Sequence, residues 1–301
     1  MRDDHLALGP DPSAAAALAV PAPARRSRVR LAALTAGALA CFAANSLLCR
    51  AALGLQLVDP ATYTWVRLVS GAAFLALVLA AARGARPAGG SFVSALAMFL
   101  YAAAFSLAYV RIGAGVGALL LFGAVQASMV GWTAIRGARP RPLQAAGLAV
   151  ALAGLAWLAL PGANAPDPWG SALMVAAGCA WGAYSLRARA ADDPLATTAH
   201  NFLLGVPLAA AFGLALLRSA SATPAGIALA AASGALASGG GYVLWYAVMP
   251  ELGATRAAAV QLAVPVLAGV GATAFLGERL TPRIAVAGVA ILAGIALTLR
   301  R

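Results

Sequence analysis

The sequence predicts an all-α polytopic membrane protein, with ten transmembrane helices arranged as two inverted five-helix repeats. Ten apolar stretches, each about one bilayer long, fill the chain from Leu31 to Leu299. Of the 301 residues, 62% are hydrophobic and 10% are charged, and the mean hydropathy is +0.87. A hydrocarbon core about 30 Å thick needs roughly 20 apolar residues per helix, and backbone groups in lipid must be satisfied within the helix itself. An internal repeat, described below, divides the ten stretches into two sets of five.

The apolar pattern and the turn residues place the helices. The expected spans are 31–49, 61–82, 92–110, 113–135, 143–160, 169–187, 195–217, 225–249, 253–276 and 282–299. Four helix starts combine a capping residue with a proline: Asp59-Pro60, Asp193-Pro194, Thr223-Pro224 and Thr281-Pro282. The capping side chain accepts hydrogen bonds from first-turn N–H groups, and proline fits the first helical position because no donor is needed there.

Arginine sets the expected orientation. The chain has no lysine, and its formal net charge is +12. With the N-terminus inside, fifteen arginines fall on the inner side and five on the outer side. Because positive residues concentrate in cytoplasmic loops, both termini are expected in the cytoplasm. Residues 1–30, rich in Ala and Pro, are expected to form a disordered cytoplasmic tail. The arginines lie in short gaps between spans, so they indicate topology rather than nucleic-acid binding.

The second half of the chain repeats the first. A shift of 140 residues overlays the fourth and fifth spans on the ninth and tenth without a gap. The informative matches are Gly113/Gly253, Gly131/Gly271, Thr133/Thr273, Arg139/Arg279, Pro142/Pro282 and Gly154/Gly294. Residues 31–161 and 162–301 are therefore expected to be two repeats, and five spans in each invert one relative to the other. Inverted repeats are common in secondary transporters, whose sites lie near the midplane between the repeats.

Several motifs resemble those of one known family. They are Arg67 in the second span, Gly113 to Leu121 opening the fourth, Gly241 to Tyr246 in the eighth, Gln261 to Val266 in the ninth, and Leu276 to Pro282 between the ninth and tenth. With these motifs the chain resembles the drug/metabolite transporter superfamily, as an EamA-type permease with two EamA repeats. The resemblance implies a multi-pass inner-membrane permease with a central cavity, which moves small metabolites or drug-like solutes, often outward. One departure is that Val125 stands where the second repeat has Pro265.

Polar residues inside spans are costly and often functional. The expected substrate-binding residues are Gln261, Gln126, Tyr246, Trp245, Tyr242, Asn45, Tyr184, Tyr101 and Asn201. The two glutamines lie near the middles of helices of the two repeats, where they could bind a substrate or join helices. The aromatic residues of the eighth span could stack on a solute or bind a cation, and they could equally form an interfacial belt.

Four further residues are expected to act in gating or structure. Arg67 is the one formal charge well inside a span; it could bond to helix-end carbonyls, extend to the membrane surface or neutralise an anionic substrate group. Glu278 is expected to pair with Arg279 or Arg283 or to cap the tenth helix. Pro265 and Pro207 each remove a hydrogen bond within a helix and are expected to kink it.

Other functions fit the sequence less well. An integral membrane enzyme needs clustered His, Asp or Glu, and a passive channel or scaffold is a further alternative. No carboxylate lies deep in a span, so proton coupling through a midplane carboxylate is not expected. The three cysteines have no metal-site spacing. No cofactor, metal or nucleic-acid partner is expected; the expected partners are a small-molecule substrate and the lipid bilayer. A coupled counter-ion or proton and the oligomeric state stay open.

Overall fold

The computed structural model describes residues 27–84, 86–137, 141–160, 162, 165–188, 191–216, 218 and 220–299. Within these ranges the regular structure is helical, apart from an isolated bridge between Val58 and Ala222. The predicted all-α class is confirmed at this level. Most of the predicted tail, 1–26, lies outside the described residues, as do Arg139, Arg189, Arg300 and Arg301.

Helices fill nearly all of the described chain. They are α2 (Arg28–Gly54), α3 (Pro60–Arg83), α4 (Phe92–Tyr109), α5 (Ala114–Ile135), α6 (Pro142–Ala159), α7 (Pro168–Ala188), α8 (Pro194–Ala215), α9 (Pro224–Ala232), the π-helix η2 (Ser233–Gly240), α10 (Gly241–Gln261), α11 (Ala263–Leu276) and α12 (Pro282–Thr298). Seven helical segments of the described chain are long and apolar enough to cross a membrane. Two shorter apolar helices are α6 and α12. With α7, which is in neither group, every expected span is largely helical.

All four predicted cap-plus-proline starts are present. Asp59 accepts hydrogen bonds from the backbone N–H groups of Ala61 and Thr62 at 3.0 and 2.9 Å, and Asp193 does the same for the start of α8. The threonine hydroxyls at the starts of α9 and α12 also accept first-turn N–H groups. Each cap satisfies donors that a helix start leaves open, so these boundaries follow from local sequence.

The expected eighth and ninth spans differ from a pair of simple helices. The eighth is divided among α9, η2 and the first part of α10. The chain then bends at Gly253, whose φ of 69° and ψ of 163° are not helical. A second interruption follows at Leu262, between α10 and α11. Pro265 explains it, because proline has no N–H to donate to the carbonyl of Gln261. Pro207 lies inside α8, which continues through it, and the expected kink there stays a prediction.

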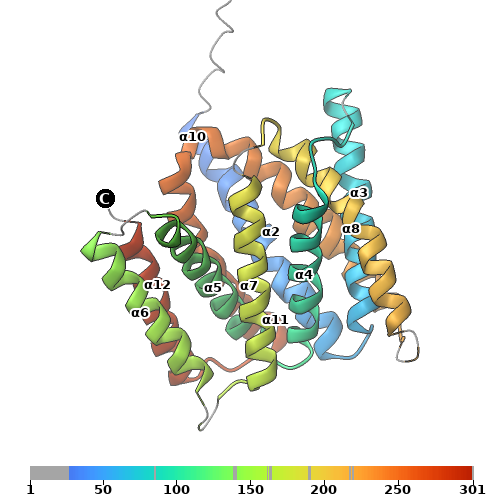
Figure 1. The fold of residues 1–301 in the computed structure, drawn as a ribbon. Coiled ribbons are helices and arrows are strands. Elements are labelled where there is room, and N and C mark those ends of the chain that lie inside the picture. Colours follow the sequence, from blue (N-terminus) through green and yellow to red (C-terminus); the bar gives the residue numbers. More distant parts are fainter. Residues whose placement is uncertain are drawn as a thin grey trace, which may run out of the picture.

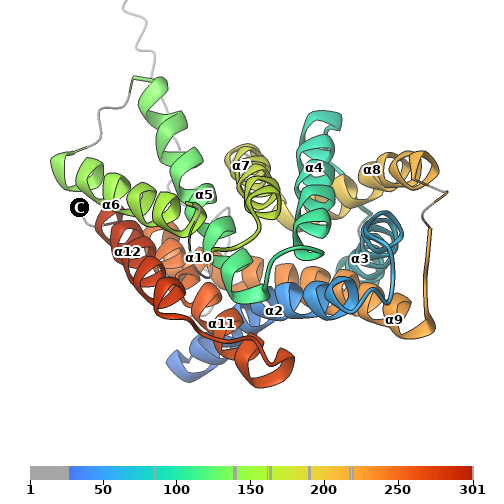
Figure 2. The same cartoon turned by 90° about the horizontal axis from the view of Figure 1, so that it is seen from below.

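The helices pack side by side in one bundle (Figure 1). Helices α6 and α12 pair at one side of the bundle, and α3 and α8 pair at the opposite side (Figure 2). Between these pairs, α7 packs on α4 and α5, while α2 packs on η2, α10 and α11. Helices α5 and α11 also contact each other. The arrangement places a central space among α2, α3, α4, α5, α7 and α10.

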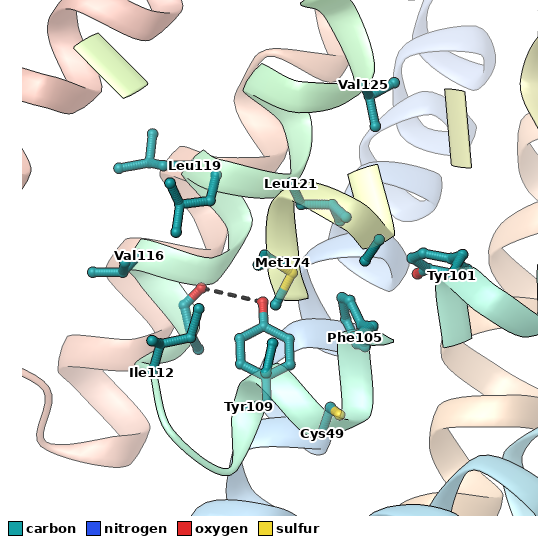
Figure 3. Packing of buried hydrophobic residues seen from close by; sticks show 14 of the residues in the cluster. Cys49, Tyr101, Phe105, Tyr109, Ile112, Val116, Leu119, Leu121, Val125 and Met174 are labelled. Atoms are coloured by element: carbon teal, nitrogen blue, oxygen red, sulfur yellow. Dashed lines mark hydrogen bonds between the residues drawn. The ribbon is translucent and has the colours of Figure 1, made fainter. Parts of the chain in front are cut away.

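The largest group of buried side chains lies around the ends of α2, α4 and α5. Figure 3 shows Tyr109 in this cluster, pointing toward the start of α5, with Cys49 and Phe105 beside it. The Tyr109 hydroxyl donates to the carbonyl of Ala114 at 3.4 Å, and its ring meets that of Phe105 edge to face at a centroid distance of 4.6 Å. This cluster fills the bundle at one end and leaves the cavity described next on its other side.

Candidate functional site

A cavity of about 560 Å³ lies in the centre of the bundle. At one end it reaches Arg67. Tyr101 and Phe105, which belong to the packed cluster of Figure 3, line the cavity at the same end. At the other end it is lined by residues at helix termini, including Ala188 of α7, Pro194 of α8 and Thr298 of α12. Small-molecule sites typically measure roughly 300–1,000 Å³. The cavity therefore has the size of a site for a small organic solute, with a deep end at Arg67.

Most of the predicted substrate-binding residues meet in this cavity. The ones that line it are Gln261, Gln126, Tyr246, Trp245, Tyr242, Asn45, Tyr184 and Tyr101. They come from α2, α4, α5, α7 and α10, so segments far apart in sequence contribute to one space. Arg67, expected in a gating or structural role, lines the cavity as well.

Aromatic rings form a column along the cavity. The Trp181 ring lies 4.9 Å from that of Tyr101, centroid to centroid, and stacks on Tyr184 at 5.1 Å. On its other side Trp181 stacks on Tyr242 at 5.9 Å, and Tyr242 stacks on Tyr246 at 6.0 Å. These rings give the cavity a mostly apolar wall with hydroxyl groups at intervals.

The hydroxyls of the column are positioned by hydrogen bonds. The Thr198 hydroxyl lies 3.0 Å from the hydroxyl of Tyr184 and 2.9 Å from that of Tyr246. It therefore joins α8 to both cavity-lining tyrosines. The side-chain amides of Gln126 and Gln261, in contrast, have no hydrogen-bond partner within the described part of the chain and line the cavity from α5 and α10. Their donors and acceptors are available to a solute.

A buried polar group closes the deep end. Arg67 is only 2% exposed, so the interpretation in which its side chain extends to the membrane surface is wrong. Its Nη2 donates to the Tyr101 hydroxyl at 3.1 Å, and Asn45 Nδ2 approaches the same oxygen at 3.4 Å. The Ser233 hydroxyl of η2 in turn donates to Asn45 Oδ1 at 2.6 Å. This network connects α2, α3, α4 and η2.

Comparison with known proteins identifies the family. Residues 168–300 match the EamA-like transporter family. An uncharacterized protein of Pseudomonas aeruginosa is 49% identical over 267 residues, which are 88% of this chain and 93% of that protein. This chain belongs to the EamA-like transporter family. A crystal structure of a protein with 19% identity superposes with a TM-score of 0.61 over 90% of this chain and 98% of that chain, which shows a shared fold.

Family membership confirms the resemblance inferred from the motifs. The EamA-like chain is a multi-pass membrane protein of a transporter family within the drug/metabolite transporter superfamily. Its apolar helices suit the lipid environment. The central cavity is the place in this fold where the predicted polar and aromatic residues converge.

Glu278 of this EamA-like chain has different partners from those predicted. Its carboxylate accepts hydrogen bonds from the N–H groups of Ala114 and Gly115 at 2.8 and 3.4 Å, and it lies 3.5 Å from Arg50 Nε. It therefore caps the start of α5 rather than α12. Gly113, the cap residue of α5, has no side chain to do so, and a Cβ there would meet the carboxylate. The helix dipole and Arg50 both favour the negative charge at this place.

Arg50 and Arg283 complete the contacts at this end of the EamA-like bundle. Arg50 Nη1 donates to the carbonyl of Tyr109 at 2.8 Å, so it joins the end of α2 to the end of α4. Arg283 was one of the two arginines expected to pair with Glu278. It donates to the carbonyls of Trp157 and Leu160 instead. Glu278 and Arg50 thus tie α2, α4, α5 and α11 together beyond the deep end of the cavity.

Asp59 links two loops at helix starts. Its second carboxylate oxygen accepts from the N–H of Ser221 at 3.0 Å, and its own N–H donates to the Ser221 carbonyl. Burial raises the pKa of Asp59, but hydrogen bonds from Thr62, Ser221 and Ala61 outweigh it and lower the pKa below its ordinary value of 3.8. The ionised carboxylate therefore stabilises the folded EamA-like chain.

The structure does not bring Asn201 to the central cavity. Its Oδ1 accepts from the N–H of Ser91 at 3.0 Å, and it lines a separate pocket of about 410 Å³ with Gly89, Arg187 and Thr197. Sequence reasoning also missed Trp181, the centre of the aromatic column. The signal available was its spacing of three residues from Tyr184, which places both on one helix face.

Proposed function

We propose that this EamA-like chain is a secondary transporter that exports a small organic solute across the inner membrane by alternating access. The observation that carries the proposal is the central cavity, which reaches helix termini at one end and stops at Arg67 at the other. Beyond Arg67, the Glu278–Arg50 contacts and the Tyr109 cluster close the bundle. A continuous pore would need both ends open, so the geometry favours a carrier over a passive channel.

The pattern of helix packing supports two inverted repeats, 31–161 and 162–301. In that arrangement α2 corresponds to α7, α3 to α8, α4 to the α9–η2–α10 segment, α5 to α11 and α6 to α12. The contact of α7 with α4 then corresponds to that of α2 with η2 and α10, and the contact of α7 with α5 to that of α2 with α11. Exchanging the two repeats leaves three further contacts unchanged, because each joins a helix to its own counterpart: α3–α8, α5–α11 and α6–α12. Two related halves can exchange an inward-open for an outward-open shape.

Arginine placement supports the sidedness. The cavity mouth lies at the ends of α7 and α12, and Arg187, one of the fifteen arginines predicted on the inner side, lies near the end of α7. By the positive-inside rule this end faces the cytoplasm, which gives a multi-pass protein with both termini cytoplasmic. The shape described here is then inward-open and ready to load a solute for export.

The proposed binding residues have distinct tasks. Gln126 and Gln261 supply free amide groups, one from each repeat. Tyr101, Tyr242 and Tyr246, together with Trp181, form the aromatic wall. The remaining predicted residues Asn45, Tyr184 and Trp245 border the same space. Pro265 and the Glu278–Arg50 contact are proposed as elements that move when the cavity changes side.

The experiment is untargeted metabolite profiling of spent medium. Cells expressing the wild type are compared with an empty vector, with a Gln261→Ala/Tyr246→Ala double variant, and with Trp65→Ala as a control that removes an exposed aromatic outside the cavity. The proposal predicts a compound enriched outside by the wild type and the control but not by the double variant. Selective depletion would mean import, enrichment by the double variant would contradict the site, and no difference from vector at equal membrane abundance would contradict transport.

A further inference from the structure

The deep end of the cavity contains a buried cation without a countercharge. Arg67 lies on α3 and is 2% exposed. Its one side-chain hydrogen bond within the described residues goes to the hydroxyl of Tyr101. The described acidic residues are Asp59, Asp167, Asp192, Asp193, Glu251 and Glu278, and none of them lines the cavity. A buried charge is costly unless it is paired and hydrogen-bonded.

Hydrogen-bond donors exceed acceptors around Arg67. Its Nε and Nη1 have no partner within the described part of the chain. The Tyr101 oxygen already accepts from Arg67 and Asn45, and the Asn45 oxygen accepts from Ser233. The Tyr101 hydroxyl hydrogen therefore remains to be donated, and the described structure shows no acceptor for it. A group of donors around a cation fits an acceptor with negative charge.

Ring contacts hold the guanidinium without neutralising it. Its carbon lies 5.2 Å from the Tyr101 ring centroid and 5.1 Å from that of Phe105. Such cation–π contacts fix the position of the guanidinium, while the positive charge stays in the cavity wall. The ring contacts leave Nε and Nη1 without an acceptor, and pairing with an anion would satisfy them.

From this we infer that the carried solute is a small organic anion, and that Arg67 and Tyr101 bind its single anionic group at the deep end of the cavity. The inference rests on the proposed transport function and adds the substrate class. One buried cation matches one anionic group, such as a carboxylate. The aromatic column and the free amides of Gln126 and Gln261 then receive the apolar and neutral polar parts of the molecule. A cationic solute would find no opposite charge among the described lining residues.

A series of probes with one shape and different charges tests this directly. The probes are 3-phenylpropanoate, the neutral 3-phenylpropanamide, the cation 2-phenylethylamine and the zwitterion phenylalanine. Binding to the purified full-length protein is followed by tryptophan fluorescence, since Trp181 and Trp245 line the cavity. The wild type is expected to bind the carboxylate about tenfold or more tightly than the amide, which corresponds to one charge-assisted contact. Arg67→Gln should abolish this preference, and Arg67→Lys should keep part of it.

Each other result overturns the inference. Equal binding of carboxylate and amide, or an Arg67→Gln variant that keeps the preference, would remove Arg67 from substrate recognition. If added chloride changes the tryptophan fluorescence and 3-phenylpropanoate does not, the site holds an inorganic ion and not an organic solute. Binding by none of the probes also overturns it, while the metabolite comparison decides separately whether the protein transports. If Arg67→Gln fails to fold, the wild type alone still tests the substrate class, because its preference for the carboxylate over the amide is measured without a variant.

Discussion

At the scale of single residues, local rules were reliable where the partners are neighbours in sequence. Asp59 was predicted to cap a helix, and it does so through the N–H groups two and three residues ahead. Glu278 was predicted to pair with neighbouring arginines, but tertiary packing brings it to Arg50 and the start of α5. A half-buried carboxylate pairs with donors that are near in space, and a sequence alone does not place helix ends relative to one another.

The cap at Asp59 leads to a stability prediction. Asp59→Ala removes bonds to the start of α3 and to Ser221, and should lower the free energy of unfolding by about 1 kcal/mol or more. Because the native pKa is lowered from 3.8, the stabilisation by the carboxylate is complete above that value and is lost as the pH falls through the native pKa. Thermal unfolding of the purified protein against pH measures both effects.

Asp59→Asn is the matched control for the charge. Its amide oxygen still caps α3, but its NH₂ group no longer accepts the Ser221 N–H. Asp59→Asn should be less stable than the wild type near neutral pH. Its stability should also fall less than that of the wild type as the pH is lowered, because the amide does not titrate. An unchanged unfolding temperature for Asp59→Ala, or an unchanged acid profile for Asp59→Asn, would contradict this account of the loop contact.

At the scale of helices, the sequence predicts where helices lie better than it predicts interruptions within them. Length, apolar composition and cap residues located each span. The π-helix η2 ends at Gly240, inside the run Gly239-Gly240-Gly241, and no sequence pattern specified a π-helix. Pro265 was expected to kink its helix and accounts for the interruption at Leu262, whereas Pro207 lies in a continuous helix.

Gly234 tests the packing of η2 on α3. A Cβ at this position would overlap the carbonyl oxygen of Arg67, so Gly234→Ala must push the two elements apart. Overpacking typically costs about 1–3 kcal/mol, and we expect a clearly lower unfolding temperature. Gly131→Ala in α5 is the control, because nothing lies near its added methyl group; it should be neutral or stabilising by about 0.5–1 kcal/mol. Equal behaviour of the two variants would contradict the close approach.

At the scale of the whole molecule, the sequence predicts two repeats but does not predict the cavity. Matching Gly, Pro and Arg positions indicate two halves, and this division of the chain stays a prediction. Most polar candidates do line one cavity, because polar residues in apolar helices turn inward. Asn201 lies away from this cavity, because its side chain binds the N–H of Ser91 before α4. Trp181 was missed, because an aromatic residue in an apolar run carries no polar signal.

The central claim is that one cavity is reached from the two sides of the membrane in turn. The most direct measurement is labelling of Gln126→Cys by a membrane-impermeant maleimide in vesicles of each orientation, in a background without Cys41, Cys49 and Cys179. Exposed Gln56 and Arg141, replaced by cysteine, report the outer and inner faces. We predict fast labelling from the cytoplasmic side and slow labelling from the outer side. Adding Glu278→Gln, which weakens the outer contact with Arg50, should speed outer and slow inner labelling. Equal labelling from both sides, or none from the outer side in either protein, would contradict alternating access.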